Sequence, residues 1–253
     1  MGRLDGRRAL VTGGSRGIGR ACAVGLAKEG ASVGITYVSN SDAAADAVHS
    51  ITTLGRQSKS YKANSSKLSD VKTAVDNFVA DFGGIDILVN NAGILKRTPF
   101  LEISEDEWDA IIGTNLKGYF LVGQTVAKKM VNNGGGVIIN ISSAGQELAA
   151  PNLAHYCTAK AGVAMLTKEM ALELAPYHIR VNAVAPGLVE TDMNRKDIAN
   201  PEFRERRMAR IPLKIIARPE DVAGTVVFLA SDDSKLSTGR TVFLDAGANI
   251  WGA

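Results

Sequence analysis

A tyrosine and a lysine lie four positions apart in the stretch HYCTAKAG, residues 155–162: Tyr156 and Lys160. On a helix such positions share one face, so the phenol and the ammonium project together, beside small residues that leave room for a ligand. A phenol with a pKa near ~10 is a poor base, but an ammonium at ~4 Å favours the phenolate by about 4 kcal/mol at an effective dielectric of ~20, against an opposing desolvation cost. The pair predicts a group that gives a proton to a carbonyl oxygen or takes one from an alcohol. Such pairs also occur in helices that only pack, so other segments must decide.

A glycine-rich segment, TGGSRGIG at residues 12–19, follows the first expected strand. Gly13, Gly17 and Gly19 stand where a strand turns into a helix. Glycines there permit a tight turn and let a diphosphate approach the backbone, while the helix N-terminus offers free N–H groups. The spacing is G-x-x-x-G-x-G rather than G-x-G-x-x-G. The segment predicts a dinucleotide site, with a purely structural turn as the alternative.

The end of the second expected strand, TYVSNS at residues 36–41, has no carboxylate before Asp42. A carboxylate there would bind the ribose hydroxyls of NAD. Arg16, in the glycine segment, can instead offer a guanidinium to a 2′-phosphate, with Ser39 and Asn40 as hydroxyl and amide partners. The alternative is that Arg16 is a solvated loop residue. We predict NADP(H), whose oxidised ring would add a second positive charge near the phenol.

The chain alternates short β-branched runs with longer helical patterns. Strands are expected at residues 9–12, 32–37, 58–62, 85–90, 136–142, 179–185 and 241–245. Helices are expected at residues 18–29, 70–82, 105–130, 154–175 and 219–230. The alternation predicts an α/β, single-domain, doubly wound Rossmann fold over residues 1–253, with about seven parallel strands and helices on both faces.

The least regular segment, residues 187–213, is either a mobile flap over the substrate or a solvated helical insertion. It follows Pro186 and contains two further prolines, at 201 and 212. Its arginines alternate with acidic residues, a pattern that indicates a solvated helix face rather than a phosphate site. The charged residues concerned are Glu202, Arg204, Glu205, Arg206, Arg207 and Arg210.

Composition excludes several classes of protein. The net charge is +3, from 29 basic and 26 acidic residues, which argues against nucleic acid or a membrane surface as the main partner. Cys22 and Cys157 fit no disulfide framework or metal-ligand spacing, and with three scattered histidines we expect no metal. No stretch of ~18 apolar residues could span a bilayer. The expectation is a cytoplasmic protein in a reducing compartment.

Taken together, the motifs resemble those of the short-chain dehydrogenase/reductase family. They are TGGSRGIG, NNAG at 90–93, Asn115, NISS at 140–143, Tyr156 with Lys160, and APGLVET at 185–191. The resemblance runs from Leu4 to the LDAGA segment at 244–248. It also accounts for the glycine spacing.

The resemblance implies roles for individual residues. Tyr156 would be the general acid/base, Lys160 would bind the nicotinamide ribose and lower the pKa of the phenol, Ser143 rather than Ser142 would bind the substrate oxygen, and Asn115 would hold a water. Gln146 is a further expected substrate contact. His155 is expected to be structural or in the substrate pocket. Besides Tyr156 and Lys160, the expected cofactor contacts are Gly13, Ser15, Arg16, Gly17, Ile18, Gly19, Tyr37, Ser39, Asn40, Asn64, Ser65, Asn91, Ala92, Gly93, Pro186, Gly187, Val189 and Thr191.

The substrate class is less well defined. In 3-oxoacyl-carrier-protein reductases, arginines before the fifth and sixth strands hold the acidic carrier, whereas Gly134 and Tyr177 occupy those places here, with Lys128, Lys129 and Arg180 nearby. Glucose 1-dehydrogenases carry an acidic residue soon after NNAG, where this chain has Leu95 and Lys96. The expected pocket wall, residues 144–154, offers Gln146, Glu147 and Asn152 among apolar residues.

We therefore predict an NADP-linked carbonyl reductase or secondary alcohol dehydrogenase acting on a small molecule. A 3-oxoacyl-carrier-protein reductase, a glucose or other polyol dehydrogenase, and a non-catalytic dinucleotide-binding protein remain alternatives. A homotetramer is expected from kinship and from apolar residues that exceed one stripe on the helices at 105–130 and 154–175. These residues are Ile111, Ile112, Leu116, Tyr119, Phe120, Met165, Leu166, Met170 and Leu172.

Overall fold

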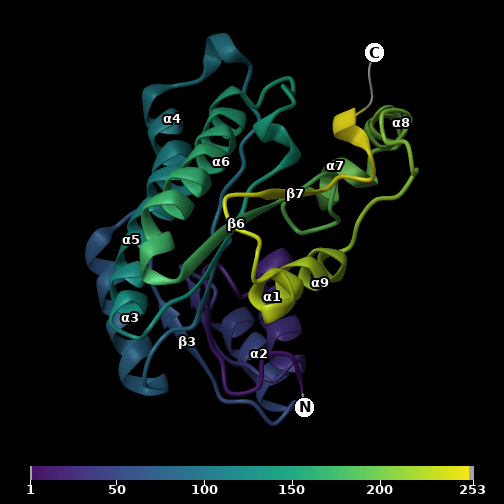
Figure 1. Cartoon of the computed structure of the whole chain (residues 1–253). Coiled ribbons are helices and arrows are strands. Elements are labelled where there is room, and N and C mark those ends of the chain that lie inside the picture. Colours follow the sequence, from purple (N-terminus) through teal and green to yellow (C-terminus); the bar gives the residue numbers. More distant parts are fainter. Residues whose placement is uncertain (1, 251–253) are drawn as a thin grey trace.

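The computed structural model describes residues 2–250 and contains one seven-stranded sheet (Figure 1). The strand order is β3-β2-β1-β4-β5-β6-β7, and every neighbouring pair is parallel. This arrangement confirms the predicted doubly wound α/β fold. The strands are β1 (Arg8–Val11), β2 (Ser32–Tyr37), β3 (Ser58–Lys62), β4 (Ile87–Asn90), β5 (Gly136–Ile141), β6 (Ile179–Pro186) and β7 (Thr241–Leu244).

Helices cover both faces of the sheet because successive strand side chains point to opposite faces. Ala9 and Val11 of β1 belong to a core shared with α1 (Gly17–Lys28), α2 (Ser41–Thr52) and α9 (Pro219–Ala230). Leu10, between them, belongs to a second core, shared with α3 (Leu68–Phe82), α5 (Gly118–Val131) and α6 (Ala154–Leu174). In Figure 1 the two helical layers lie on either side of the sheet.

The helix expected over residues 105–130 is interrupted. It consists of α4 (Glu105–Ile112), a π-helical turn (Gly113–Lys117) and α5. Within the turn, the Asn115 amide accepts from the backbone N–H of Ile94 and donates to its carbonyl, both at 2.8 Å. A side chain committed to a distant loop holds the helix in this irregular turn, which helical periodicity does not reveal. Ile111 and Tyr119, expected among the surplus apolar residues, are buried within the subunit.

Residues 187–213 contain two helices, α7 (Arg195–Ala199) and α8 (Pro201–Ala209). The Asn200 side chain accepts from the Phe203 N–H at 3.1 Å and so caps α8, which begins with Pro201. Leu188, Ile198 and Ile211 form a small apolar cluster of their own, against which Phe203 packs. The segment is therefore a packed helical insertion, located beyond the ends of β6 and β7 (Figure 1).

No helix within residues 2–250 is long and apolar enough to cross a membrane.

Candidate active site

A cavity of about 580 Å³ lies at the carboxyl ends of the central strands, where ligands of doubly wound sheets bind. All the predicted site residues line it except Gly19, Asn115 and Gln146. The glycine turn and the end of β2 form one end of the cavity. Tyr156, Ser143 and Lys160 line it further along, together with Leu153, Met193 and Arg207. The structure thus brings together segments that the sequence separates by more than a hundred residues.

The glycine turn presents backbone rather than side chains to the cavity. Gly13 and Gly17 have φ angles of +63° and +54°, a region that favours glycine, and a Cβ on Gly13 would lie 3.0 Å from the Cα of Ala92. Asn91 fixes the turn by donating to the carbonyls of Thr12 and Gly13 at 3.0 and 3.2 Å. No acidic residue occupies the first turn of α1, so its positive dipole end is available to an anion.

Gly19 is a predicted cofactor contact that does not line the cavity, and its contact with the cofactor stays a prediction. Gly19 is buried, and a Cβ there would lie 2.3 Å from the Gly13 carbonyl oxygen. Its function is to let α1 approach the turn.

Charge at this end of the cavity is positive. Arg16 is exposed and forms no ion pair within residues 2–250. Among the described residues that line the cavity, Asp192 is the one carboxylate, and it is paired with Arg195 at 2.9 Å. Tyr37, Ser39 and Asn40 line the end of β2. No side chain here would repel a 2′-phosphate.

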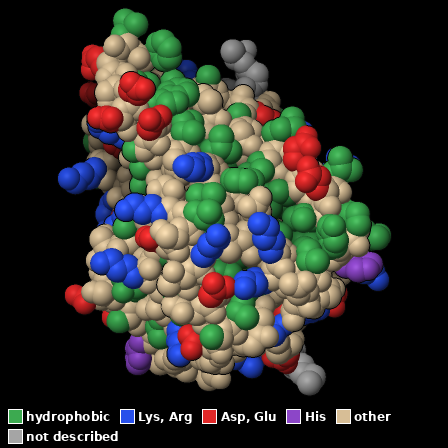
Figure 2. Space-filling model, turned by 90° about the vertical axis from the view of Figure 1, so that its left-hand side faces the viewer, with side chains coloured by type: hydrophobic (Ala, Val, Ile, Leu, Met, Phe, Trp, Pro, Cys, Tyr) green, Lys and Arg blue, Asp and Glu red, His purple; other side chains and the backbone are tan. Residues whose placement is uncertain are grey.

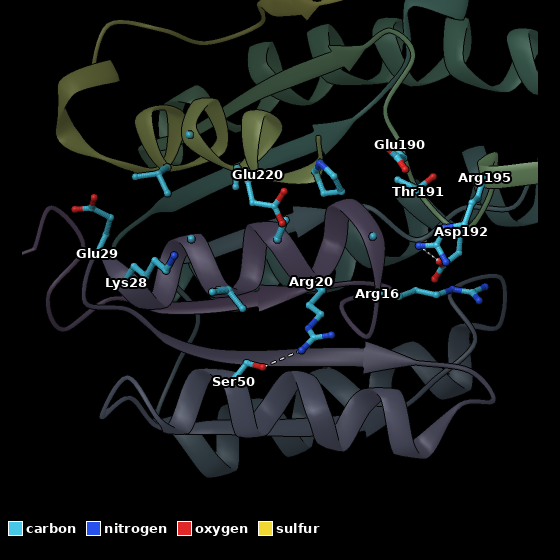
Figure 3. Close-up of a pocket in the computed structure, with 18 of the residues that line it drawn as sticks. Arg16, Arg20, Lys28, Glu29, Ser50, Glu190, Thr191, Asp192, Arg195 and Glu220 are labelled. Atoms are coloured by element: carbon cyan, nitrogen blue, oxygen red, sulfur yellow. Dashed lines mark hydrogen bonds and ion pairs between the residues drawn. The ribbon is translucent and has the colours of Figure 1, made fainter. Parts of the chain in front are cut away.

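A second hollow, of about 680 Å³, lies between α1 and α9 on the other side of Arg16 (Figure 3). Its charged side chains are of both signs, including Arg20, Lys28, Glu29 and Glu220. Arg20 donates to the Ser50 hydroxyl at 2.9 Å. This mixture favours no ligand of a single charge.

Lys160 is a buried residue in the wall of the cavity. Its ammonium donates to the Ile141 carbonyl at 2.8 Å and to the Tyr119 hydroxyl at 3.0 Å, and it lies 5.9 Å from the centre of the Tyr156 ring. Burial lowers the pKa of Lys160 to about 7. Tyr119, which the sequence analysis placed on the surface, is therefore part of the site; it lies four residues after Asn115 and one helical turn along the same chain segment.

Burial raises the pKa of Tyr156 above its ordinary value, while a hydrogen bond with Ser143 and the charge of Arg97 act in the lowering direction. Lys160 is not among the groups that lower the pKa of Tyr156, contrary to expectation. Desolvation of the phenol is the largest effect, and it raises this pKa. Ser143 also accepts from the Gly145 N–H at 3.1 Å. The neighbouring Ser142 hydroxyl donates to the Lys160 carbonyl at 3.2 Å, a structural contact.

Asn115 is completely buried, and both ends of its amide are bonded to Ile94. The side chain therefore does not reach the cavity. Gln146, the further predicted substrate contact, does not line the cavity, and its Oε1 is buried without a hydrogen-bond partner among residues 2–250; its contact with substrate stays a prediction.

His155 and Glu107 form a buried support for Tyr156 that the sequence analysis missed. The His155 Nδ1 accepts from the Tyr156 N–H at 2.9 Å, which leaves Nε2 to donate to the Glu107 carboxylate at 2.9 Å. Glu107 also accepts from Lys96 and Thr98, and these bonds lower its pKa to about 2. His155 is therefore a structural residue. No short-range signal links positions 48 residues apart.

A parallel sheet with a glycine turn at its switch point, and a tyrosine–lysine pair in the same cavity, define an oxidoreductase of the Rossmann type. The chain matches the family described as enoyl-(acyl carrier protein) reductase over residues 13–249. It belongs to the short-chain dehydrogenase/reductase family.

Relatives within the family act on different substrates. The chain is 42% identical over 241 residues to the 3-oxoacyl-[acyl-carrier-protein] reductase FabG of Staphylococcus epidermidis, which covers 95% of this chain and 98% of the relative. It is 39% identical over 253 residues to 3beta-hydroxysteroid dehydrogenase 1 of Eggerthella lenta, with 98% of this chain and 95% of the relative covered. The gluconate 5-dehydrogenase of Burkholderia cenocepacia, solved with NADP and tartrate, superposes with a TM-score of 0.94 at 40% identity, covering 99% of this chain and 98% of that one.

Proposed function

We propose that this protein is an NADP(H)-dependent oxidoreductase that interconverts a ketone and a secondary alcohol, with Tyr156 as the general acid/base. The observation that carries the proposal is that Tyr156, Ser143 and Lys160 line the same cavity as the glycine turn. The identity of about two fifths with reductases and dehydrogenases supports the reaction class.

Four features of the dinucleotide end fit NADP(H). The glycine turn leaves space for a diphosphate against the backbone, and the N-terminus of α1 has no acid in its first turn. Arg16 has no carboxylate partner among the described residues and can bind a 2′-phosphate bidentately, and no acidic side chain at the end of β2 would take the ribose hydroxyls. Asn64 and Ser65 would lie beside the adenine, and Pro186, Gly187, Val189 and Thr191 beside the nicotinamide.

When bound, NADPH supplies a hydride to the carbonyl carbon. Tyr156 gives its hydroxyl proton to the carbonyl oxygen as the C=O π bond becomes C–H and O–H bonds, and Ser143 orients that oxygen. Lys160 stabilises the phenolate that remains until a proton returns from solvent. Since burial raises the pKa of Tyr156, the protein's own groups favour the protonated phenol, the form that reduction needs. Alcohol oxidation reverses each step.

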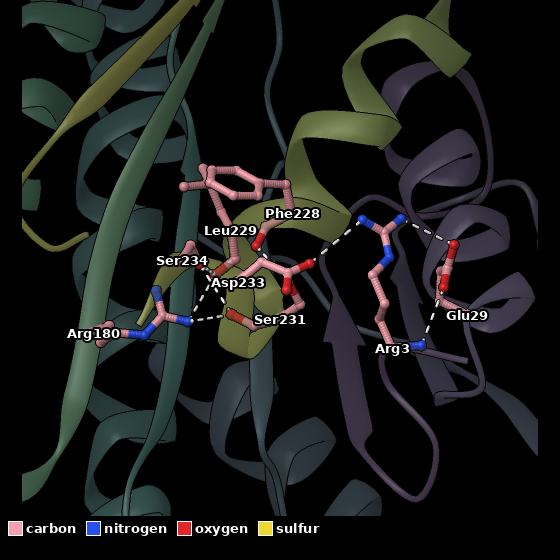
Figure 4. Close-up of polar contacts among 8 residues, drawn as sticks. All are labelled: Arg3, Glu29, Arg180, Phe228, Leu229, Ser231, Asp233 and Ser234. Atoms are coloured by element: carbon pink, nitrogen blue, oxygen red, sulfur yellow. Dashed lines mark hydrogen bonds and ion pairs between the residues drawn. The ribbon is translucent and has the colours of Figure 1, made fainter. Parts of the chain in front are cut away.

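Reduction of a 3-oxoacyl group on an acidic carrier protein is the second candidate, favoured by the 42% identity to FabG. The basic residues near β5 and β6 give it little support. Arg180 points inward and donates to the carbonyls of Leu229 and Ser231 at 2.9 and 3.1 Å (Figure 4). Lys129 is paired with Asp76 at 2.8 Å. Lys128 is exposed, and the other two places hold Gly134 and Tyr177.

We also propose that the protein is a cytoplasmic homotetramer. Phe120, Met165 and Leu172 are exposed on α5 and α6, and Figure 2 shows hydrophobic side chains gathered on this side of the molecule among charged ones. Buried Cys22 and half-buried Cys157 are both free thiols, which suits a reducing compartment. We propose further that residues 187–213 form a flap over the substrate, because Leu188, Met193 and Arg207 of this segment line the cavity. Light scattering on the purified protein would test the assembly.

A panel assay tests the reaction itself. Purified protein is mixed with NADPH or NADH and neutral ketones, oxo acids and 3-oxoacyl thioesters, and the loss of reduced-cofactor absorbance is followed. We expect NADPH oxidation with at least one ketone and a clear preference over NADH. If no carbonyl causes NADPH or NADH oxidation, and no alcohol or polyol causes reduction of the oxidised cofactor, the protein binds a dinucleotide without turnover and the proposal is wrong.

A further inference from the structure

Two arginines from distant segments line the substrate end of the cavity. Arg97 lies in the loop after β4, and Arg207 lies on α8; both share the cavity with Tyr156. The charge of Arg97 acts on the pKa of both Tyr156 and Arg207, so Arg97 is within electrostatic range of each of the two. The substrate end of the cavity therefore carries two cationic side chains. This corrects the interpretation of Arg207 as part of a solvated helix face.

Arg97 is held in place and has donors to spare. Its Nε donates to the Asp197 carboxylate at 3.0 Å, and its guanidinium lies 5.6 Å from the centre of the Phe203 ring. Its two terminal nitrogens form no hydrogen bond with any group in residues 2–250. Contacts with Asp197 and Phe203 thus orient Arg97, while its two terminal nitrogens remain free to donate hydrogen bonds to a ligand.

Arg207 has no counterion. Its side chain is half-buried, and within residues 2–250 it forms neither an ion pair nor a side-chain hydrogen bond. Burial and the charges of Arg97, Arg210 and Arg206 lower its pKa, yet a guanidinium stays protonated at neutral pH. A partly buried cation among other cations is unfavourable unless an anion joins it.

We propose that the substrate carries a carboxylate, which Arg207 binds together with the free edge of Arg97. The substrate class is then an oxo acid and the corresponding hydroxy acid, whose reacting carbonyl lies at Tyr156 and Ser143. A guanidinium fork matches a carboxylate bidentately, and Asp192, the carboxylate in the cavity lining, is already paired with Arg195. This inference rests on the proposed function, because it assigns the substrate of the same site.

Matched substrate pairs test the proposal. Initial rates with NADPH are measured for oxo acids of increasing chain length and for their methyl esters, with a 3-oxoacyl thioester bearing a phosphorylated carrier arm as a further probe. We expect at least one acid to have a KM about 10-fold or more below that of its ester, since the ester lacks the charge that strengthens hydrogen bonds to the guanidinium. Equal KM values for acids and esters would overturn the proposal. A preference for the phosphorylated thioester over every free acid would overturn it in favour of a carrier-bound substrate.

Arg207→Met tests the residue. We expect it to raise the KM for the preferred acid about 10-fold or more, to raise the KM for the ester much less, and to spare NADPH affinity measured by fluorescence titration. Arg206→Met is the matched control, because Arg206 is exposed on the same helix and does not line the cavity. Arg207→Lys keeps the charge but loses the bidentate guanidinium, so its KM for the preferred acid should lie between those of the parent and of Arg207→Met. Equal losses for acid and ester would refute the assignment. If esters and neutral ketones are reduced without any preference for acids, this inference fails alone; if no carbonyl is reduced, the proposed function fails.

Discussion

The dinucleotide end of the cavity is formed largely by backbone, whereas the substrate end is formed by side chains from segments far apart in the sequence. Gly13 and Gly17 shape the first end through their φ angles. Arg97 and Arg207, 110 positions apart in the sequence, charge the second. Tyr156 lines the same cavity as both sets of residues. A backbone site is specified by local residue types and tolerates few changes, whereas a side-chain site can change its ligand by single substitutions. That difference agrees with relatives of similar identity that are named for acyl, steroid and sugar-acid substrates.

Arg16→Ala should produce the largest change confined to the dinucleotide end. We expect NADPH to bind about 10–100-fold more weakly, since charge-assisted hydrogen bonds to the 2′-phosphate are lost, while NADH affinity stays the same. Fluorescence titration of both cofactors measures this.

Arg20→Ala is the matched control for Arg16, because Arg20 is exposed on α1, four residues after Arg16, and is bonded to Ser50. If Arg16→Ala loses as much affinity for NADH as for NADPH, or loses no affinity for NADPH, then Arg16 does not bind the 2′-phosphate.

Glu107→Gln should weaken the support under Tyr156. The pKa of Glu107 is lowered to about 2, so its contribution to stability is present above the ordinary carboxyl pKa and is lost as the pH falls toward about 2. We expect the variant to have a lower urea midpoint than the parent at pH 7 and a smaller deficit at pH 3. Its kcat should also fall more than its cofactor affinity, because His155 no longer fixes the N–H of Tyr156.

Glu105→Gln removes an exposed carboxylate from the same helix and provides the comparison. A stability deficit that is the same at both pH values, or equal in the two variants, would show that the Glu107 carboxylate does not support the site.

Lys160→Met should change how stability depends on pH. Burial lowers the pKa of Lys160 to about 7, so between about pH 7 and the ordinary value of 10.5 the unfolded chain binds more protons than the folded one. The stability that this group contributes therefore rises with pH across that window. Urea midpoints at pH 7 and 9.5 should show the parent gaining stability relative to Lys160→Met; parallel changes would mean that the ammonium is not desolvated.

The elements and the dinucleotide end could be predicted because their signals are local. Strand–helix alternation fixed the sheet, and the spacing of Tyr156 and Lys160 within one helix placed both in the cavity. The π-helical turn could not be predicted, since it depends on Asn115 bonding to Ile94, which periodicity does not encode.

The substrate end could not be predicted either, because contacts between distant segments also determine which of its side chains face the cavity. The alternation of charges in residues 202–210 suits a solvated helix, and only the packing of α8 over the cavity turns Arg207 inward. Gln146 lies three residues after Ser143, yet its side chain turns away from the cavity. Helical geometry indicates that His155 does not share a face with Tyr156 and is therefore not catalytic. Its partner Glu107 lies on α4, and no sequence pattern pairs the two.

The most direct measurement of the central claim is the comparison of Tyr156→Phe with the parent, by NADPH titration and steady-state kinetics on the same preparations. Loss of the hydroxyl should lower kcat/KM by about 10²–10⁴-fold, the usual contribution of general acid–base catalysis, while the dissociation constant of NADPH stays within about 3-fold of the parent. A variant that keeps a near-parental rate, or that loses rate only as far as it loses NADPH, would contradict the assignment of Tyr156 as the proton donor.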